Sequence, residues 1–269
     1  MDRQYVGIDF HRRRSVIVRL SAAGEKLSSV GVANDPVAIA AAVAEAGPDP
    51  EVVIEATYGW HWVVDLLEAN GARVHLANPQ GLNWGQRRVK NDERDAIDLA
   101  DMLRLGRLPE AWIAPPEVRE LRELVRYRAK LVALRWGLQA QVHAVMAKGG
   151  VLPAQGRMFG PAGNAQLDAI VMADNYTTRV ASLRELIERY DQQVGTLAGE
   201  IHRQLRGHRG YHTIQAINGI GPTIAAVVVA EIGDVARFRS AQALCSWAGL
   251  TPKHRESTPS ASIPSALCL

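Results

Sequence analysis

The chain has 269 residues, 47% of them apolar, and a formal net charge of +3 at pH 7. This length and apolar content suffice for a hydrophobic core and for two domains. The small basic excess permits a polyanionic partner but does not require one. The two cysteines, Cys245 and Cys268, are too few for a disulfide framework and lack a zinc-type spacing, which favours a reduced, cytosolic protein.

Membrane insertion is not expected. The residues before Asp9 do not form a signal peptide, because this carboxylate interrupts the first apolar stretch. The most apolar run, from Ile224 to Ala230, is too short to span a bilayer. We therefore expect a soluble, cytoplasmic protein without a membrane partner.

Residues 1–114 are predicted to form one domain with a mixed α/β sheet. Short apolar runs and turn signals such as Asn34-Asp35-Pro36 separate its elements. Three strands come first, and strands then alternate with helices, which favours a mixed sheet over a uniformly parallel one. The predicted strands cover residues 4–10, 15–20, 26–33, 51–55 and 72–77, and the predicted helices cover 37–46, 60–69 and 92–106.

Residues 115–208 are predicted to form a long helical region. Apolar residues recur at spacings of three, four and seven in two stretches, 117–148 and 176–206, which indicates amphipathic helices or a coiled coil. Residues 149–164 are rich in glycine and proline and are predicted to be a linker. The two helices could pair within the chain or across a dimer.

Residues 209–256 are predicted to form a small helical domain, followed by a disordered Ser/Pro-rich tail at 257–269. The segment from Gly219 to Pro222 lies between two apolar helical stretches and resembles the hairpin of a helix-hairpin-helix. There, Gly219 and Gly221 would let backbone amides approach a phosphate. A tight turn between packed helices explains the segment nearly as well.

Four carboxylates are candidate catalytic and metal-binding residues. Asp9 lies on an apolar strand, Glu55 ends a second one, and Asp92 and Asp95 share a face at a helix start. Buried carboxylates that converge repel one another, and a divalent cation removes that conflict. Magnesium suits such a site because it prefers oxygen ligands.

Each carboxylate also has an ordinary structural explanation. Asp9 could cap a turn, and Glu55 could pair with an arginine or cap the next helix. Asp92 and Asp95 could simply favour a helix amino terminus, where the macrodipole stabilises negative charge. The four together, in this strand–strand–helix order, favour the metal site; Asp98 is expected to be a helix-surface residue or a supporting partner.

Basic residues beside these carboxylates are candidate nucleic-acid ligands. A loop just before Asp92 would bind phosphate near the reacting bond through Arg87, Arg88 and Lys90. The run from Arg12 to Arg14 is expected to cross a hairpin turn, where phosphate binding and simple solvation are both open.

A basic stripe is predicted on the helix over 117–148, with spacings of three, four and four, and consists of Arg119, Arg122, Arg126 and Lys130. Such a stripe fits a nucleic-acid backbone. The alternative is a solvated face paired with Glu120 and Glu123.

Aromatic residues cluster after Glu55, namely Tyr58, Trp60, His61 and Trp62. They could stack on nucleobases. The alternative, which the residue types favour for at least two of them, is packing of the following helix against the sheet. His61 could be catalytic, although a single histidine is more often structural.

Three separated blocks of sequence resemble insertion-sequence transposases of the IS110 type, in that family's order. The first matches its DEDD motif, the second the start of its coiled coil, and the third its carboxy-terminal transposase domain. The blocks are Tyr5–Asp9, Val53–Thr57 and Lys90–Ala96; Arg119–Leu131; and Ile214–Pro222, Ala230–Asp234 and Phe238–Pro252. The resemblance covers residues 4 to about 256.

This resemblance implies a DNA recombinase. It implies an RNase H-like, RuvC-like domain that binds Mg²⁺ through Asp9, Glu55, Asp92 and Asp95. It also implies a coiled coil that assembles a homo-oligomer, and a second catalytic domain whose serine forms a covalent intermediate with DNA. The implied partners are DNA of the element ends and target, and a structured guide RNA.

One departure from the family concerns that serine. Family members continue from the Thr-Pro-x-x-Arg-Glu-Ser segment into a Gly-Ser block, whereas here a Ser/Pro-rich tail follows. The tail serines lack the family context, so none is assigned as nucleophile: Ser257, Ser260, Ser262 and Ser265. We expect a truncated and impaired transposase; the alternatives are a non-catalytic DNA- or RNA-binding remnant and a metal-dependent structure-specific nuclease.

Overall fold

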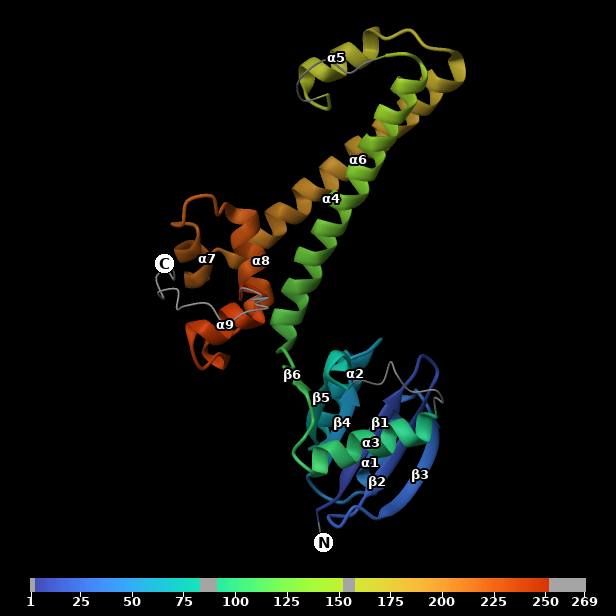
Figure 1. The fold of residues 1–269 in the computed structure, drawn as a ribbon, viewed down its shortest axis with the longest axis vertical. Coiled ribbons are helices and arrows are strands. Elements are labelled where there is room, and N and C mark those ends of the chain that lie inside the picture. The colour runs from blue at the N-terminus through green and yellow to red at the C-terminus, as the bar shows by residue number, and fades with distance from the viewer. Residues whose placement is uncertain (1–2, 83–90, 152–157, 252–269) are drawn as a thin grey trace, which may run out of the picture. The chain divides into compact units, whose positions relative to one another are not determined.

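The structure is a computed structural model that describes residues 3–82, 91–151 and 158–251 (Figure 1). The chain divides into two compact units, residues 1–114 and 115–269. Among the described helices, none has both the length and the apolar content that a membrane crossing needs.

The first unit contains a six-stranded mixed sheet. Its strand order is β3-β2-β1-β4-β5-β6, with β4 parallel to both β1 and β5 and the other pairs antiparallel. The strands are β1 (Tyr5–Phe10), β2 (Arg14–Leu20), β3 (Lys26–Ala33), β4 (Glu51–Glu55), β5 (Arg73–Ala77) and β6 (Glu110–Ala111). The predicted mixed sheet is confirmed; β6, with two residues, is too short to leave an alternating pattern in the sequence.

Helices cover both faces of this sheet: α1 (Pro36–Ala44), α2 (Trp60–Ala69) and α3 (Asp92–Arg104), with a short 3-10 turn, η1 (Pro79–Gly81). Side-chain caps start two of them: Asp35 accepts hydrogen bonds from backbone amides of α1, and Asn91 does so for α3. Alternate β1 residues Val6, Ile8 and Phe10 pack with α1 and α2. The opposite face of the sheet packs against α3.

Helix α3 approaches β1 very closely at Gly7. A Cβ atom added there would lie 1.9 Å from the carbonyl oxygen of Ala96 and 3.0 Å from the backbone nitrogen of Ala100. Real side-chain carbons do not approach backbone atoms to 1.9 Å, so only glycine admits the helix at this position. The same approach sets the first residue of α3, Asp92, over the end of β1.

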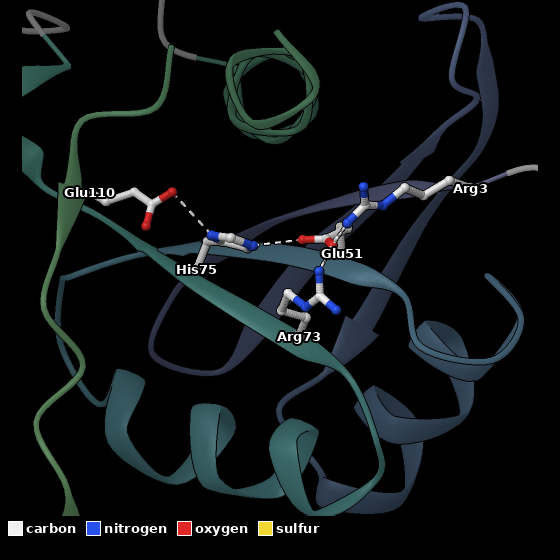
Figure 2. A network of polar contacts seen from close by, with 5 residues as sticks. All are labelled: Arg3, Glu51, Arg73, His75 and Glu110. Carbon is white, nitrogen blue, oxygen red and sulfur yellow. Dashed lines mark hydrogen bonds and ion pairs between the residues drawn. The ribbon is translucent and has the colours of Figure 1, made fainter. Parts of the chain in front are cut away.

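A polar network around the buried Glu51 connects three strands of the sheet at the amino end of β4 (Figure 2). The Glu51 carboxylate accepts hydrogen bonds from Arg3 and, at 2.9 Å, from Arg73. Its other oxygen lies 2.6 Å from Nε2 of His75, whose Nδ1 is 3.1 Å from Glu110 of β6. These partners offset the desolvation of a buried carboxylate and link β4, β5 and β6.

The second unit is helical in its described part. It contains α4 (Pro116–Lys148), α5 (Pro161–Ala169), α6 (Asp174–Leu205), α7 (Arg209–Ile214), α8 (Pro222–Ile232), the 3-10 turn η3 (Val235–Arg237) and α9 (Ala241–Trp247). Helix α5 begins inside the predicted linker 149–164, with Pro161 in its first turn, so that linker prediction extends too far.

Helices α4 and α6 pair within the chain and run antiparallel (Figure 1). Near the start of α4, Val125 packs with Ile201, whereas near its end Val145 packs in a cluster with Val180 of the α6 start. Of the two alternatives for the helix pair, the structure contains the intrachain one.

We expect Gly7→Ala to destabilise the first unit by about 3 kcal/mol or more, because the new methyl group forces α3 away from β1. Urea denaturation of the full chain, followed by circular dichroism, measures this. Gly31→Ala is the matched control, since a Cβ on Gly31 of β3 meets nothing within 4 Å. Equal stability of the Gly7→Ala and wild-type chains would contradict the close approach.

Candidate functional site

Asp9 and Asp92 meet where β1 ends and α3 begins. Side chains alternate along a strand, so Asp9 faces α3 together with Gly7. The Asp9 side chain is only 9% exposed. Asp92 is the first residue of α3 and lies directly after the Asn91 cap. The close packing at Gly7 therefore brings two predicted site residues together.

His11 joins these two carboxylates. One ligand atom each from Asp9, His11 and Asp92 lie within 4.8 Å of one another. The His11 Nε2 atom is 3.0 Å from Oδ2 of Asp9 and 3.3 Å from Oδ1 of Asp92. Within the described part of the chain, Nε2 is shielded from solvent and makes no hydrogen bond of normal geometry. A buried nitrogen between two carboxylate oxygens is a donor set that fits a divalent cation.

The backbone at His11 is held in place by Asn34. The Asn34 amide nitrogen donates a hydrogen bond to the His11 carbonyl oxygen. The Asn34 amide oxygen accepts a hydrogen bond of 2.6 Å from the hydroxyl of Ser15, a fully buried residue. Asn34 thus fixes the chain that carries the imidazole.

His11 is absent from the sequence-based predictions. The sequence feature that could have identified His11 is its position two residues after Asp9, because side chains two residues apart share one face of extended backbone. The three arginines that follow His11 favoured an interpretation of this segment as a basic hairpin turn.

Glu55 and Asp95 lie near this group but are not part of it. The register pairs Ile8 with Ile54, so Asp9 and Glu55 follow on neighbouring parallel strands. Asp95 is 4% exposed and lies one turn after Asp92 on α3. Among the described residues, the three-membered group contains neither, so their roles as metal ligands stay predictions.

Much of the aromatic cluster after Glu55 packs internally. Trp60 lies partly buried against the sheet core and stacks on His61, with ring centroids 4.0 Å apart. Trp62 packs edge-on against Phe10 at 5.8 Å. The packing alternative therefore accounts for Trp60 and for one edge of Trp62, while Trp62 is still 37% exposed and Tyr58 is 75% exposed.

Two models of known protein families match this chain. Residues 6–149 match the sequence model of the IS110 DEDD transposases, described as "Transposase". Residues 211–265 match a second model, described as "Transposase IS116/IS110/IS902 family". The chain belongs to the IS110 family of transposases. The resemblance inferred from the three sequence blocks is thereby confirmed.

Individual relatives agree with this assignment. A protein of Pseudomonas aeruginosa named "Probable family 20 transposase" is 29% identical over 75% of this chain and 61% of its own length. A protein of insertion element IS116 from Streptomyces clavuligerus is 26% identical over 95% of this chain and 78% of its own. The transposase for insertion sequence element IS1111A of Coxiella burnetii is 25% identical over 77% and 57%. The IS110-family chain thus spans less than two thirds of two of these relatives.

Two residues of the predicted basic stripe connect helix α4 to the end of α8 in this transposase chain. Arg122 donates hydrogen bonds of 2.8 Å each to the carbonyl oxygens of Ala230 and Glu231, at the end of α8. Arg126 donates two bonds, of 2.7 and 2.6 Å, to the Glu231 carboxylate. Cations suit a helix carboxyl terminus, where carbonyl groups lack intrahelical partners. Arg119 is half-buried on α4, and Lys130 is exposed.

These contacts shift the titration of the groups involved. The hydrogen bond from Arg126 lowers the pKa of Glu231 below its ordinary value. Burial lowers the pKa of Arg122, partly opposed by the charge of Glu231. The hydrogen bonds to Glu231, and to a smaller extent the charge of Glu123, raise the pKa of Arg126, so Glu231 and the predicted Glu123 both interact with this stripe.

The glycines before α8 differ in their backbone conformation. Gly219 has φ of +88°, which favours glycine, whereas Gly221 precedes α8 with φ of −83°. In the described part of the chain, a Cβ on either residue would meet nothing within 4 Å. The turn thus requires glycine only at Gly219, and the backbone of both residues is open to approach.

Several predicted residues of the transposase lie outside the described residues. They are the loop residues Arg87, Arg88 and Lys90, and the tail serines Ser257, Ser260, Ser262 and Ser265.

We expect Glu231→Gln to lower the stability of the chain at pH 7 by about 1 kcal/mol, because a partly exposed ion pair is lost. Since the pKa of Glu231 is lowered in the folded state, its contribution is present above pH 4.5 and disappears as pH falls through the folded pKa. Urea denaturation should show a larger difference in stability between the two chains at pH 7 than at pH 3.

Glu185→Gln is the control for this variant, since Glu185 and Arg189 form an exposed pair on α6. It should change stability by less than about 0.5 kcal/mol. An equal gap between Glu231→Gln and wild type at both pH values would contradict the ion-pair explanation.

Proposed function

We propose that this IS110-family chain acts as a DNA recombinase of an insertion sequence and cleaves DNA with the help of a divalent metal ion. The observation that carries the proposal is the convergence of Asp9, His11 and Asp92 at the junction of β1 and α3. Catalytic roles are assigned to Asp9, Glu55, Asp92 and Asp95, with His11 as an additional ligand.

The residues of the first unit would hold the metal in defined places. Asp9 is buried on β1, Asp92 is fixed by the start of α3, and Asn34 holds the backbone of His11. A bound divalent ion would neutralise the carboxylates and supply Lewis-acid activation for phosphoryl transfer. We propose Mg²⁺ as the ion, on the oxygen ligands, and the imidazole also makes the site suitable for Mn²⁺.

Nucleic acid would be bound by basic side chains and by open backbone in both units. We assign phosphate contacts to Arg87, Arg88, Lys90, Arg119, Lys130 and the backbone at Gly219 and Gly221. Arg122 and Arg126 are assigned chiefly to the support of α8, because their guanidinium groups already bind its end. The proposed partners are DNA of the element ends and target, and a guide RNA.

We propose an RNase H-like first domain, a coiled coil formed by α4 and α6, and a helix-hairpin-helix formed by α7 and α8. The coiled coil would also assemble a homo-oligomer. Support for assembly comes from large side chains that stay exposed on the paired helices: Tyr127, Leu134, Trp136 and Leu186.

Metal binding is tested first. We expect Mn²⁺ to raise the unfolding temperature of the wild-type chain, because a ligand that binds only the folded state stabilises it. Asp9→Asn and His11→Ala should weaken Mn²⁺ binding by about tenfold or more, measured by titration calorimetry. Asp101→Asn is the control, since Asp101 pairs with Arg104 on α3 outside the group. Equal Mn²⁺ affinity of Asp9→Asn and wild type would remove the site from the proposal.

Cleavage is tested with DNA of the element ends, guide RNA and Mg²⁺. We expect activity to disappear on chelation of the metal and to fall by about a hundredfold or more in Asp9→Ala, Glu55→Ala, Asp92→Ala and Asp95→Ala. Gel analysis of the products measures this, with Asp101→Ala as the active control. Unchanged cleavage in all four carboxylate variants would exclude these residues from the reaction.

A further inference from the structure

A hollow of about 360 Å³ opens at the carboxyl ends of the parallel strands β1 and β4. Ligands in open α/β sheets commonly bind outside the carboxyl ends of strands. Two segments far apart in sequence meet here, the hairpin after β1 and the turn before α2. The side chains that matter are Phe10, Arg12, Asn34, Tyr58 and Trp62, with Gly59 between the aromatic residues.

The hollow offers aromatic surface to solvent. Tyr58 is 75% exposed and Trp62 is 37% exposed. Trp62 is held in place because it packs edge-on against Phe10, with an angle of 70° between the ring planes. One wall of the hollow is thus the fixed indole of Trp62. The other wall is the phenol ring of Tyr58, whose exposed position is not explained by packing. Exposed aromatic rings of this kind are the usual platforms for nucleobases.

Gly59 keeps the hollow open. It precedes α2 in the left-handed conformation, with φ of +75° and ψ of 8°. A Cβ at this position would lie 3.4 Å from Phe10 and 4.0 Å from the indole nitrogen of Trp62. The missing side chain therefore leaves space between the aromatic walls that any other residue would partly fill.

The charge of the hollow suits an anion. Arg12 is exposed at its rim, and none of the lining residues is acidic. The Asn34 amide is committed to His11 and Ser15, so it forms a fixed wall rather than a ligand group. A flat apolar group that carries a phosphate matches this combination of aromatic walls and a single cation.

We propose that the hollow holds one unpaired nucleobase of the DNA strand that is cleaved at Asp9, His11 and Asp92. This inference rests on the proposed function. Phe10 lies between Asp9 and His11 in sequence, and its ring points to the opposite face of β1. The hollow and the carboxylate group thus occupy two faces of the same sheet edge. Tyr58 and Trp62 stack on the base, and Arg12 binds its phosphate.

The test measures binding of a short fluorescent deoxythymidine oligonucleotide to the full chain in the presence of a chelator. We expect Tyr58→Ala to weaken binding by about fivefold or more, and Tyr58→Phe to stay within about twofold of wild type. Arg12→Gln should weaken binding as well. Tyr176→Ala is the matched control and should bind as wild type does, because Tyr176 is an exposed tyrosine at the start of α6.

An oligonucleotide with abasic sites separates base binding from backbone binding. The wild-type chain should bind the abasic strand more weakly than the intact strand. The Tyr58→Ala chain should bind the abasic strand as tightly as the wild-type chain does. Four outcomes would overturn the proposal: no binding by the wild-type chain, unchanged affinity in Tyr58→Ala, an equal loss in Tyr176→Ala, or tighter Tyr58-dependent binding of the ribonucleotide strand, which would assign the hollow to RNA.

This experiment is independent of metal and of cleavage. Failure of the Asp9 and Asp92 variants to lose activity would contradict the proposed reaction but leave the measured base affinity intact. Loss of the base affinity alone would contradict the proposed base binding in the hollow and would leave the proposed metal site unaffected.

Discussion

The close approach of α3 to β1 is the constraint on which the candidate site depends. A Cβ on Gly7 would lie 1.9 Å from the Ala96 carbonyl oxygen, so the helix backbone lies directly on the strand. Because the spacing between helix and strand is set there, Asp92 at the start of α3 reaches Asp9 and His11 at the end of β1. Any side chain at this position would separate Asp9 from Asp92.

The end of β1 serves two faces of the sheet at once. Asp9 and His11 point towards α3, where carboxylate and imidazole groups converge, and Phe10 points into the packing with α2. Asn34 connects the two sides, since it binds the His11 carbonyl oxygen and also lines the aromatic hollow. A change in this hairpin would therefore affect both faces of the sheet together.

In the second unit, positive charge has a structural use. Arg122 and Arg126 lie on the predicted basic stripe, yet both bind the end of α8. Half of an apparent nucleic-acid surface thus consists of cations that satisfy terminal carbonyl groups and one carboxylate. Spacing along a helix shows which residues share a face, but it does not show which partner lies opposite.

The sequence by itself determined the order of the five longer strands and three helices of the first unit, the family, and the positions of all four candidate carboxylates on those strands and on α3. These features are local: alternation, capping residues such as Asp35 and Asn91, and short motifs leave their pattern in consecutive residues. Only the tertiary structure decided the rest. It identified His11 as a candidate ligand, and it showed that Arg122 binds a carbonyl group more than a hundred residues away. Contacts between such distant segments depend on packing that no local pattern encodes.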